Sequence, residues 1–488
     1  MPAASRLKRE IGLFSAIAIV VANMVGTGIF TTSGFILQEV GSSTGLLAGW
    51  LIGGAFALCG ALCYGELGAR YPQAGGEYVY LREAFGKPVA FLSGWISLIV
   101  GFSAPIAAAA IAFATYLLRA MGVPANSDRV VELFGVTLLT FSAPVMLAIA
   151  VVLMLSILHI HSLRIGSRIQ NLLTLFKIVM VVCFIAAGLA SSGGSAAHFS
   201  EGAPIRTLLD GKFAVALIFI SFAYSGWNAA AYLGGEIKRP SRNIPLAMLV
   251  GTLIVTVLYL LLNLVYIYAL PANEMKGVME VAAAAGTRLF GAGLGRWLNG
   301  AIALGLLSVL SAMILAGPRV YYAMSRDGIF FPLFGRVSHA RHTPVPAIGL
   351  QAAIAMVMIV SASYDKLLIY IGFTLSLFGM LTVIGLMRLR SRQIDDLPDY
   401  RTWGYPLIPL IFITGNLWII YFSVKSRPAP VIWGISTIAV GLLMYVYFYR
   451  KGHRPHLNQS GHSPVVTHLI SDRSEIELIP STPEEDLS

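Results

Sequence analysis

The sequence predicts an all-α integral membrane protein with twelve transmembrane helices, and three observations carry that prediction. Hydrophobic residues make up 57% of the 488 residues and charged residues only 12%, whereas soluble domains carry about 25% charged residues. Apolar runs of roughly 20 residues, the length that crosses a bilayer core, recur along almost the whole chain. Basic residues collect in every second connection between these runs. No soluble domain of useful size fits between them.

The predicted spans are 11–37, 44–69, 88–119, 141–160, 169–190, 213–235, 245–270, 297–323, 345–362, 366–387, 406–423 and 431–449. The first begins after only ten residues. It is too long for the hydrophobic region of a signal peptide and is followed at once by another span, so we expect it to be retained. The longer spans allow for tilt or for a break in the helix.

Most of the 34 Lys and Arg residues fall in the connections that share a side with the N-terminus. Positive charge marks the cytoplasmic side of a membrane protein. The sequence therefore predicts a multi-pass protein of the cell membrane with both termini in the cytoplasm. The net charge of +11 does not indicate a nucleic-acid partner, because a nucleic-acid surface gathers its basic residues on one face.

Two spans are interrupted in the middle. The first carries Asn23 and then Gly26-Thr27-Gly28, and the sixth carries Ser225-Gly226-Trp227-Asn228. Gly226 repeats Gly26 at about the offset that also relates the neighbouring spans. We therefore predict two copies of a five-helix unit with opposite orientations in the membrane, a 5+5 inverted repeat with discontinuous helices 1 and 6.

The predicted division of the chain follows from this repeat. It comprises a cytoplasmic N-terminus (1–10), a first repeat (11–190), a second repeat (213–390), two added helices (405–450) and a disordered cytoplasmic tail (453–488). The tail is polar and contains several prolines, a composition typical of disorder.

The breaks predict a binding site. Unwound backbone within a membrane survives only where it faces protein or a cavity. The broken ends expose N–H groups with partial positive charge and C=O groups with partial negative charge, so two facing breaks can hold a zwitterion. The alternative for Gly-Thr-Gly alone is a close helix-packing motif of small residues.

Several stretches resemble a known family. They are VGTGIF (25–30), CYGELGARYPQAGGEYVYLREAFG (63–86), FAYSGWN (222–228), EIKRPSRNIPLA (236–247) and SRDGIFFP (325–332). They resemble the amino acid–polyamine–organocation (APC) superfamily. The nearest branch is the L-type amino acid transporters, the light subunits of heteromeric transporters, together with their bacterial relatives. The resemblance implies the LeuT/APC-type fold, alternating access and amino-acid substrates.

The resemblance also implies the residues that contact substrate. They are Met24, Gly26, Thr27, Gly28, Phe222, Ser225, Gly226 and Asn228. In this reading the amides of the first break bind the carboxylate, and the carbonyls of Met24, Phe222 and Ser225 bind the amino group. Phe222 corresponds to the aromatic gate that closes over substrate. Asn228 either touches the substrate, bridges the two broken helices or makes only an interhelical hydrogen bond.

Lys177 is the basic residue that lies well inside a span. A bare charge there costs about 3 kcal/mol, unless the side chain extends to the membrane surface. The resemblance implies instead that its ammonium reaches the unwound part of the first span and replaces a sodium ion bound by other branches. The lysine could also link transport to protons.

Other polar residues receive structural interpretations. Glu66, with Arg70 one helical turn on, is expected to act in a cytoplasmic gate, with proton carriage as the alternative. Glu77, in GGEYVYLREAFG, and its neighbours Arg82 and Glu83 are expected to be solvated or to make gate contacts. His159 and His161 are expected at the membrane interface. The same sequence favours no metal and no cofactor.

The three cysteines, Cys59, Cys63 and Cys183, lie within predicted spans, where they read as packing residues. The light subunits that this chain resembles carry a cysteine between spans three and four, and the loop at about 119–140 has none. The sequence therefore does not favour a disulfide-linked heavy chain. It leaves the oligomeric state open.

These observations predict a secondary active transporter or exchanger of neutral L-amino acids, sodium-independent and open to a proton link. A neutral substrate is favoured because no acidic residue lies deep in spans one, three, six, eight or ten. Positions 103–109, 308, 311 and 373–378 are candidates for the side-chain pocket by location alone. The alternative is an amino-acid sensor that signals through its tail. The spans offer no convergent catalytic groups for an enzyme.

Overall fold

The computed structural model describes residues 9–452 except 124–128, 134–135, 162, 203–210, 279, 339–342, 362–363, 393–399 and 427. The predicted tail and the first eight residues lie outside this range. Within it, ten helices are long and apolar enough to cross a membrane, and two shorter apolar helices, Gly211–Tyr224 and Val345–Ser361, stand where spans six and nine are predicted. The prediction of a helical membrane protein is confirmed at this level.

The first half of the described chain contains eleven helical segments of α, π or 3-10 type and a hairpin. They are α1 Leu13–Met24, α2 Thr27–Thr31, α3 Ser33–Val40, α4 Ser43–Arg70, α5 Glu77–Phe85, α6 Lys87–Ile96, the π-helix η1 Ser97–Ser103, α7 Ala104–Ala120, β1 Arg129–Leu133, β2 Val136–Phe141, α8 Ala143–His161, α9 Leu163–Ala190 and the 3-10 helix η2 Ala196–Ser200.

The second half continues with helices and one further 3-10 turn. They are α10 Gly211–Tyr224, α11 Ala229–Tyr232, α12 Pro240–Ala269, α13 Ala272–Met275, α14 Val281–Ala316, α15 Pro318–Arg326, the 3-10 helix η3 Pro332–Gly335, α16 Val345–Ser361, α17 Tyr364–Arg392, α18 Leu407–Ser426 and α19 Pro428–Gly452. Helix α14 departs from helical geometry at Gly291, where φ is 84°.

The antiparallel pair of β1 and β2 was not predicted. It lies in the connection that the sequence analysis treated as a plain loop. The two strands are rich in valine and threonine, RVVEL and VTLLTF, and β-branched residues favour extended backbone. The fold is therefore helical apart from this one hairpin among the described residues.

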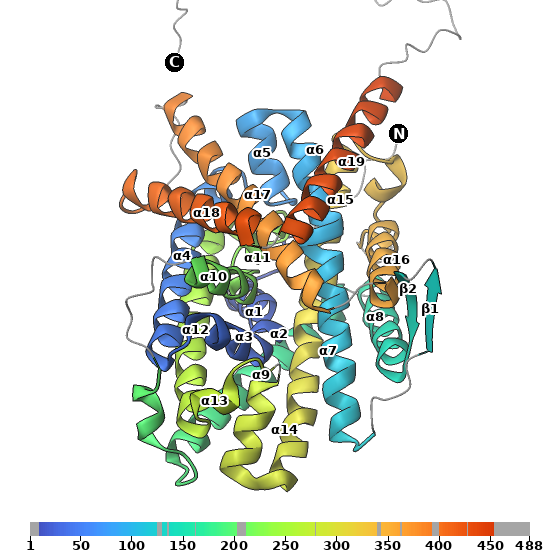
Figure 1. Ribbon diagram of the computed structural model, residues 1–488. Coiled ribbons are helices and arrows are strands. Elements are labelled where there is room, and N and C mark those ends of the chain that lie inside the picture. The colour runs from blue at the N-terminus through green and yellow to red at the C-terminus, as the bar shows by residue number, and fades with distance from the viewer. Residues whose placement is uncertain are drawn as a thin grey trace, which may run out of the picture. The chain divides into compact units, whose positions relative to one another are not determined.

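Helix α1 lies at the centre of the packing. It contacts α12, α9, α14 and α11, while α12 runs along α4 and α14 runs along α7 (Figure 1). Eight of the twelve residues of α1 are buried, Ala16, Ala18, Ile19, Val20, Val21, Ala22, Asn23 and Met24. A helix that is apolar on all sides belongs in the interior of a helical membrane protein. This burial places the first break deep inside the protein.

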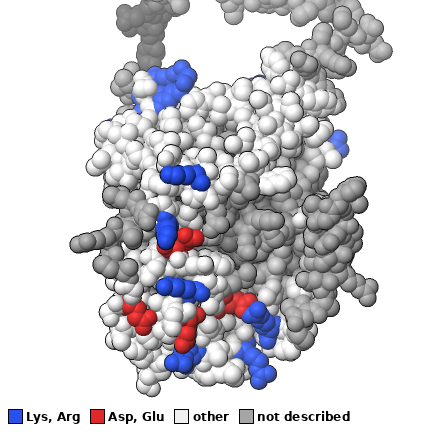
Figure 2. All heavy atoms as spheres, viewed as in Figure 1, with Lys and Arg blue, Asp and Glu red and all other residues white. Residues whose placement is uncertain are grey.

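Charged side chains cover little of the outer surface. In Figure 2 most of the described surface in view carries neither Lys, Arg, Asp nor Glu, and the acidic residues in that view lie in its lower half. Many large apolar side chains of α9, α18 and α19 are exposed, among them Leu172, Leu417 and Leu443. Such a surface suits lipid rather than water.

Candidate functional site

The first helix break lies between α1 and α2. Val25 has ψ of 81°, outside the helical range, and Gly26 is extended, with φ −120° and ψ −150°. The amide of Gly26 turns back onto the carbonyl of Met24 at 2.7 Å. The chain then enters α2, whose first N–H groups have no partner within the helix because no turn precedes them. Val25 and Gly26 thus interrupt the backbone hydrogen bonds of the helix and leave main-chain groups without helical partners.

The second break follows α10. Residues 225–228 form a turn between α10 and the short α11. Gly226 has φ of 98°, a conformation that a side chain disfavours. The amide of Ser225 donates to the carbonyl of Phe222 at 3.0 Å, and the amide of Ala229 donates to the carbonyl of Gly226 at 3.0 Å. The local sequence Ser-Gly-Trp-Asn therefore forms a tight turn rather than a continued helix.

The two breaks touch each other. A Cβ atom placed on Gly226 would lie 2.8 Å from the Cβ and 2.9 Å from the carbonyl carbon of Asn23, in α1. A Cβ atom on Gly28 would lie 2.5 Å from the Cα of Ala223, in α10. Contacts this short require glycine at both positions. The structure therefore brings together two unwound segments that are far apart in the sequence.

Gly226→Ala is expected to destabilise the protein by about 1–3 kcal/mol, because the alanine adds strain at a positive φ and collides with Asn23. Thermal unfolding of the purified protein in detergent measures this effect. Gly349→Ala is the control, since a Cβ there meets nothing within 4 Å and alanine favours the helix. Equal melting temperatures for the two variants would show that the breaks do not need close contact.

Tyr259, in α12, connects both breaks and was missed by the sequence analysis. Its hydroxyl lies 2.6 Å from the carbonyl oxygen of Met24 and 3.0 Å from that of Ala223. A carbonyl has two lone pairs. Those of Met24 are engaged by Tyr259 and by the amide of Gly26, so in this conformation Met24 offers no acceptor to a substrate ammonium. A tyrosine buried in an apolar span needs a partner for its hydroxyl, but the sequence does not reveal which partner.

Lys177, in α9, is fully buried. Its Nζ donates to the carbonyl oxygens of Ala22 at 3.1 Å and Val25 at 2.5 Å. Both carbonyls belong to the end of α1, where the helix leaves its acceptors unpaired and carries partial negative charge. The ammonium therefore stands against the first break and does not extend to the membrane surface.

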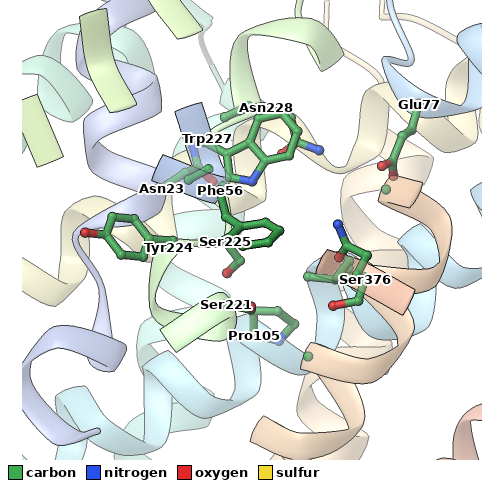
Figure 3. A pocket seen from close by; sticks show the side chains of 18 of the residues that line it. Asn23, Phe56, Glu77, Pro105, Ser221, Tyr224, Ser225, Trp227, Asn228 and Ser376 are labelled. Carbon is green, nitrogen blue, oxygen red and sulfur yellow. The ribbon is translucent and has the colours of Figure 1, made fainter. Parts of the chain in front are cut away.

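The main cavity, of about 110 Å³, lies beside the second break. Residues of α4, η1, α10, α17 and α18 line it together with the turn 225–228. Figure 3 shows Asn228 and Glu77 on one side of this cavity and Ser221 and Pro105 on the other. Glu77 is the only Asp, Glu, Lys or Arg among the described residues that line it.

The small cavity, of about 20 Å³, adjoins the main cavity through shared wall residues that include Asn23, Ser225 and Met313. It lies between the two breaks, and its volume is about that of one water molecule. Each residue that the sequence analysis assigned to substrate lines one of these two cavities. Those of the small cavity are Met24, Gly26, Thr27, Gly28, Phe222 and Ser225, and those of the main cavity are Ser225, Gly226 and Asn228.

Only some of the candidates for the side-chain pocket line a cavity. Pro105, Ala109, Leu375 and Ser376 line the cavities. Ser308 and Ser311 do not, since their hydroxyls bond to the carbonyl of Gly305 and to a histidine ring, respectively. The sequence placed these residues by depth only, and the rotation of each helix decides which face looks into a cavity.

Three expectations for individual polar residues are corrected. Glu66 pairs with Arg390 of α17, at 2.5 and 2.6 Å, instead of with its helical neighbour Arg70. His159 is 1% exposed and bonds to Ser311 at 2.8 Å, so it is not an interfacial residue. Glu77 is 5% exposed and faces a cavity, so it is not solvated. The partners of Glu66 and His159 lie on helices distant in sequence.

Arg82 and Glu83 do lie near the surface. Arg82 pairs with Glu83 and with Asp327 at the end of α15. Cys59 and Cys63 are buried and Cys183 is exposed on α9, and all three are free thiols. No group of three or more potential metal ligands occurs among the described residues.

A helical membrane protein with a cavity where two interrupted helices meet is built like a carrier of small molecules. The chain belongs to the amino acid permease family, whose model matches residues 11–448. It is 31% identical to the serine/threonine exchanger SteT of Bacillus subtilis (strain 168), over 85% of this chain and 91% of that protein. It is 31% identical to the b(0,+)-type amino acid transporter 1 of Mus musculus, over 98% of this chain and 94% of the relative.

The chain is also 29% identical to the large neutral amino acids transporter small subunit 2 of Mus musculus, over 92% of this chain and 82% of the relative. These relatives are transporters rather than enzymes, and they confirm the resemblance noted from the sequence motifs. The chain is a multi-pass membrane protein of a family of amino acid transporters and exchangers.

Proposed function

We propose that this protein is a secondary active transporter or exchanger of neutral L-amino acids that works by alternating access, without sodium. The observation that carries the proposal is the contact between the two breaks, with a cavity between them that residues of both breaks line. We further propose that residues 11–190 and 213–390 form the 5+5 inverted repeat, followed by two added helices at 405–450. The corresponding positions of the breaks in the two halves support this division.

In the proposed binding mode, the amides of Thr27 and Gly28 at the start of α2 hold the substrate carboxylate, as helix N-termini hold anions. The carbonyls of Phe222 and Ser225 hold the ammonium. Phe222 is 7% exposed and lines the small cavity, a position that suits a lid. Because the small cavity holds about one water, substrate enters only when Phe222 and its neighbours move.

Lys177 supports sodium independence. Carbonyl oxygens of a broken helix are the groups with which transporters coordinate sodium. Here the carbonyls of Ala22 and Val25 already accept from the ammonium of Lys177. In this proposal the ammonium of Lys177, which is part of the protein, takes the place of a bound sodium ion.

A neutral side chain fits the main cavity, whose walls include Phe102, Met313 and Leu375. Two of the relatives are named for serine and threonine and for large neutral amino acids, and these side chains carry no charge. We also propose that both termini lie in the cytoplasm and that the pair of Glu66 and Arg390 closes the cytoplasmic side. With no cysteine at about 119–140, the protein is proposed to work without a disulfide-linked heavy chain.

The proposal predicts that the purified protein in proteoliposomes exchanges internal for external radiolabelled amino acid. The screen covers the natural amino acids, each with and without sodium and at acidic and alkaline pH. We expect counterflow of one or more neutral amino acids, at rates that are equal with and without sodium. Liposomes without protein are the control. Saturable binding without flux would instead favour the amino-acid sensor and overturn the transporter.

A further inference from the structure

Glu77 is a buried acid on the wall of the main cavity. It is the first residue of α5, which lies outside the candidate spans. Its side chain is 5% exposed. Its two oxygens accept from different tyrosines, Oε1 from the hydroxyl of Tyr64 and Oε2 from that of Tyr232 at 3.4 Å. Figure 3 shows its carboxyl group directed into the cavity.

No cation is paired with this carboxyl group among the described residues. The group faces Tyr64 from α4 and Tyr232 from α11, and it interacts electrostatically with Tyr80 on its own helix. The hydroxyl of Tyr80 is itself buried without a partner among the described residues. Three phenols therefore surround the acid, and none of them carries positive charge.

On the other elements packed against α5, the charged groups nearest to it bind other residues or face outward. From α17, Arg388 lies over the ring of Phe85 and Arg390 binds Glu66. From the end of α15, Asp327 accepts from Tyr78 and Arg82. At the start of α6, Lys87 is exposed. Because no neighbour neutralises it, burial raises the pKa of Glu77 to about 7, although the hydrogen bonds from the two tyrosines act in the opposite direction.

The acid is connected to the second break. Tyr232, which donates to Glu77, also accepts from the Nδ2 of Asn228 at 3.3 Å. The carbonyl of Tyr232 accepts from the amide of Gly75 at 3.1 Å, which fixes the start of α5 to the end of α11. A chain of two hydrogen bonds thus runs from Glu77 to the turn 225–228.

We propose that Glu77 is a proton-binding site whose loading and release link substrate movement to protons, an inference that rests on the proposed transport function. A proton from water in the main cavity binds Oε2, and the carboxylate becomes a neutral carboxylic acid. The new O–H then donates to Tyr232, so the hydrogen of the Tyr232 hydroxyl must turn away. Tyr232 then accepts hydrogen bonds from both Glu77 and Asn228. Through these two bonds the protonation state of Glu77 affects the second break.

Two measurements on the full-length protein test this proposal. The first is the initial rate of uptake into proteoliposomes between about pH 6 and about pH 8. A single obligatory proton lowers the rate by up to about tenfold for each pH unit above its pKa, which for Glu77 is about 7. We expect that fall in the natural protein and a flat profile for Glu77→Gln. A pH dye inside the vesicles should report proton entry with substrate for the natural protein only.

The second measurement needs no transport. A carboxyl group whose pKa is raised by folding stabilises the folded state when protonated, and this contribution is lost as the pH rises through the folded pKa. The melting temperature of the natural protein should therefore fall as the pH rises from about 4.5 to about 7 and level off above it, and that of Glu77→Gln should fall less. Glu83→Gln is the matched control, since Glu83 lies on the same helix and is exposed.

The outcomes are separable. Absence of flux in the natural protein overturns the proposed function, and the melting profiles still decide whether Glu77 binds the proton. Identical melting profiles for the natural protein and Glu77→Gln overturn the site. A changed melting profile with an unchanged uptake profile overturns the link to transport. Tyr232→Phe removes the connecting hydroxyl and with it a hydrogen bond that lowers the pKa of Glu77. It should therefore extend the fall in melting temperature to higher pH but flatten the uptake profile.

Discussion

Lys177→Ala is expected to lower the initial rate of amino-acid uptake by about 100-fold or more. The buried ammonium makes hydrogen bonds to two carbonyls of the first break, and a hydrogen bond to a charged group contributes about 1.5–3 kcal/mol. The loss of both bonds destabilises this conformation of α1 and α2 by at least about 3 kcal/mol relative to its alternatives. Its population would then fall by about 100-fold. Uptake into proteoliposomes, with and without sodium, measures the effect.

The protein itself should still insert and fold, because the site also loses the burden of a buried charge. Size-exclusion chromatography in detergent checks this point. Lys212→Ala, at an exposed lysine near the start of α10, is the control and should transport normally. Normal uptake by Lys177→Ala without added ions would contradict the assignment of this lysine to the first break.

Arg319→Ala is expected to reduce the free energy of unfolding by about 3–5 kcal/mol, the usual effect of removing one partner of a buried ion pair. Arg319, in α15, is 1% exposed, and Glu236 is fully buried. The guanidinium binds both carboxylate oxygens, at 2.9 and 3.2 Å, and the carbonyl of Leu315 at 2.5 Å. The variant leaves Glu236 as an uncompensated buried charge.

The backbone of Glu236 also connects the two halves of the chain. The backbone of Glu236 bonds to Ile11, just before α1, at 2.9 Å, so the loop after the second break is attached to both α15 and the start of the first span. The double variant Glu236→Leu with Arg319→Leu should be less destabilised than Arg319→Ala, since no charge remains. Arg326→Ala, exposed on the same helix, should change stability by less than about 0.5 kcal/mol. A melting temperature of Arg319→Ala equal to that of Arg326→Ala would disprove the argument.

Glu236 and Arg319 also illustrate what remained hidden in the sequence. Arg319 stands near the end of the predicted span 297–323 and Glu236 directly after the predicted span 213–235, and neither position by itself indicates burial. The same holds for Glu66 and Arg390, and for Glu77. Burial of such groups depends on which helices meet at the ends of the spans. A single sequence shows the charge of a residue but not the element that covers it.

The helices themselves could be predicted closely. The predicted span 44–69 is the helix Ser43–Arg70, and 245–270 is Pro240–Ala269. Length and apolarity set these boundaries, because a bilayer core accepts only segments of a certain length with their backbone bonds satisfied internally. The hairpin of β1 and β2 was missed, since alternation over so few residues gives a weak signal beside long apolar runs.

The sequence by itself determined that this is a helical membrane protein of a transporter family, and it located the irregular segments at Gly26 and Gly226. Both properties are local, because apolar length and helix-breaking residues act on the chain where they stand. Only the tertiary structure decided that the two breaks touch, that Tyr259 joins them and that Glu77 opens onto the cavity beside the second. Those facts depend on the rotation and packing of helices that are distant in sequence, and these follow from the whole set of contacts rather than from any one segment.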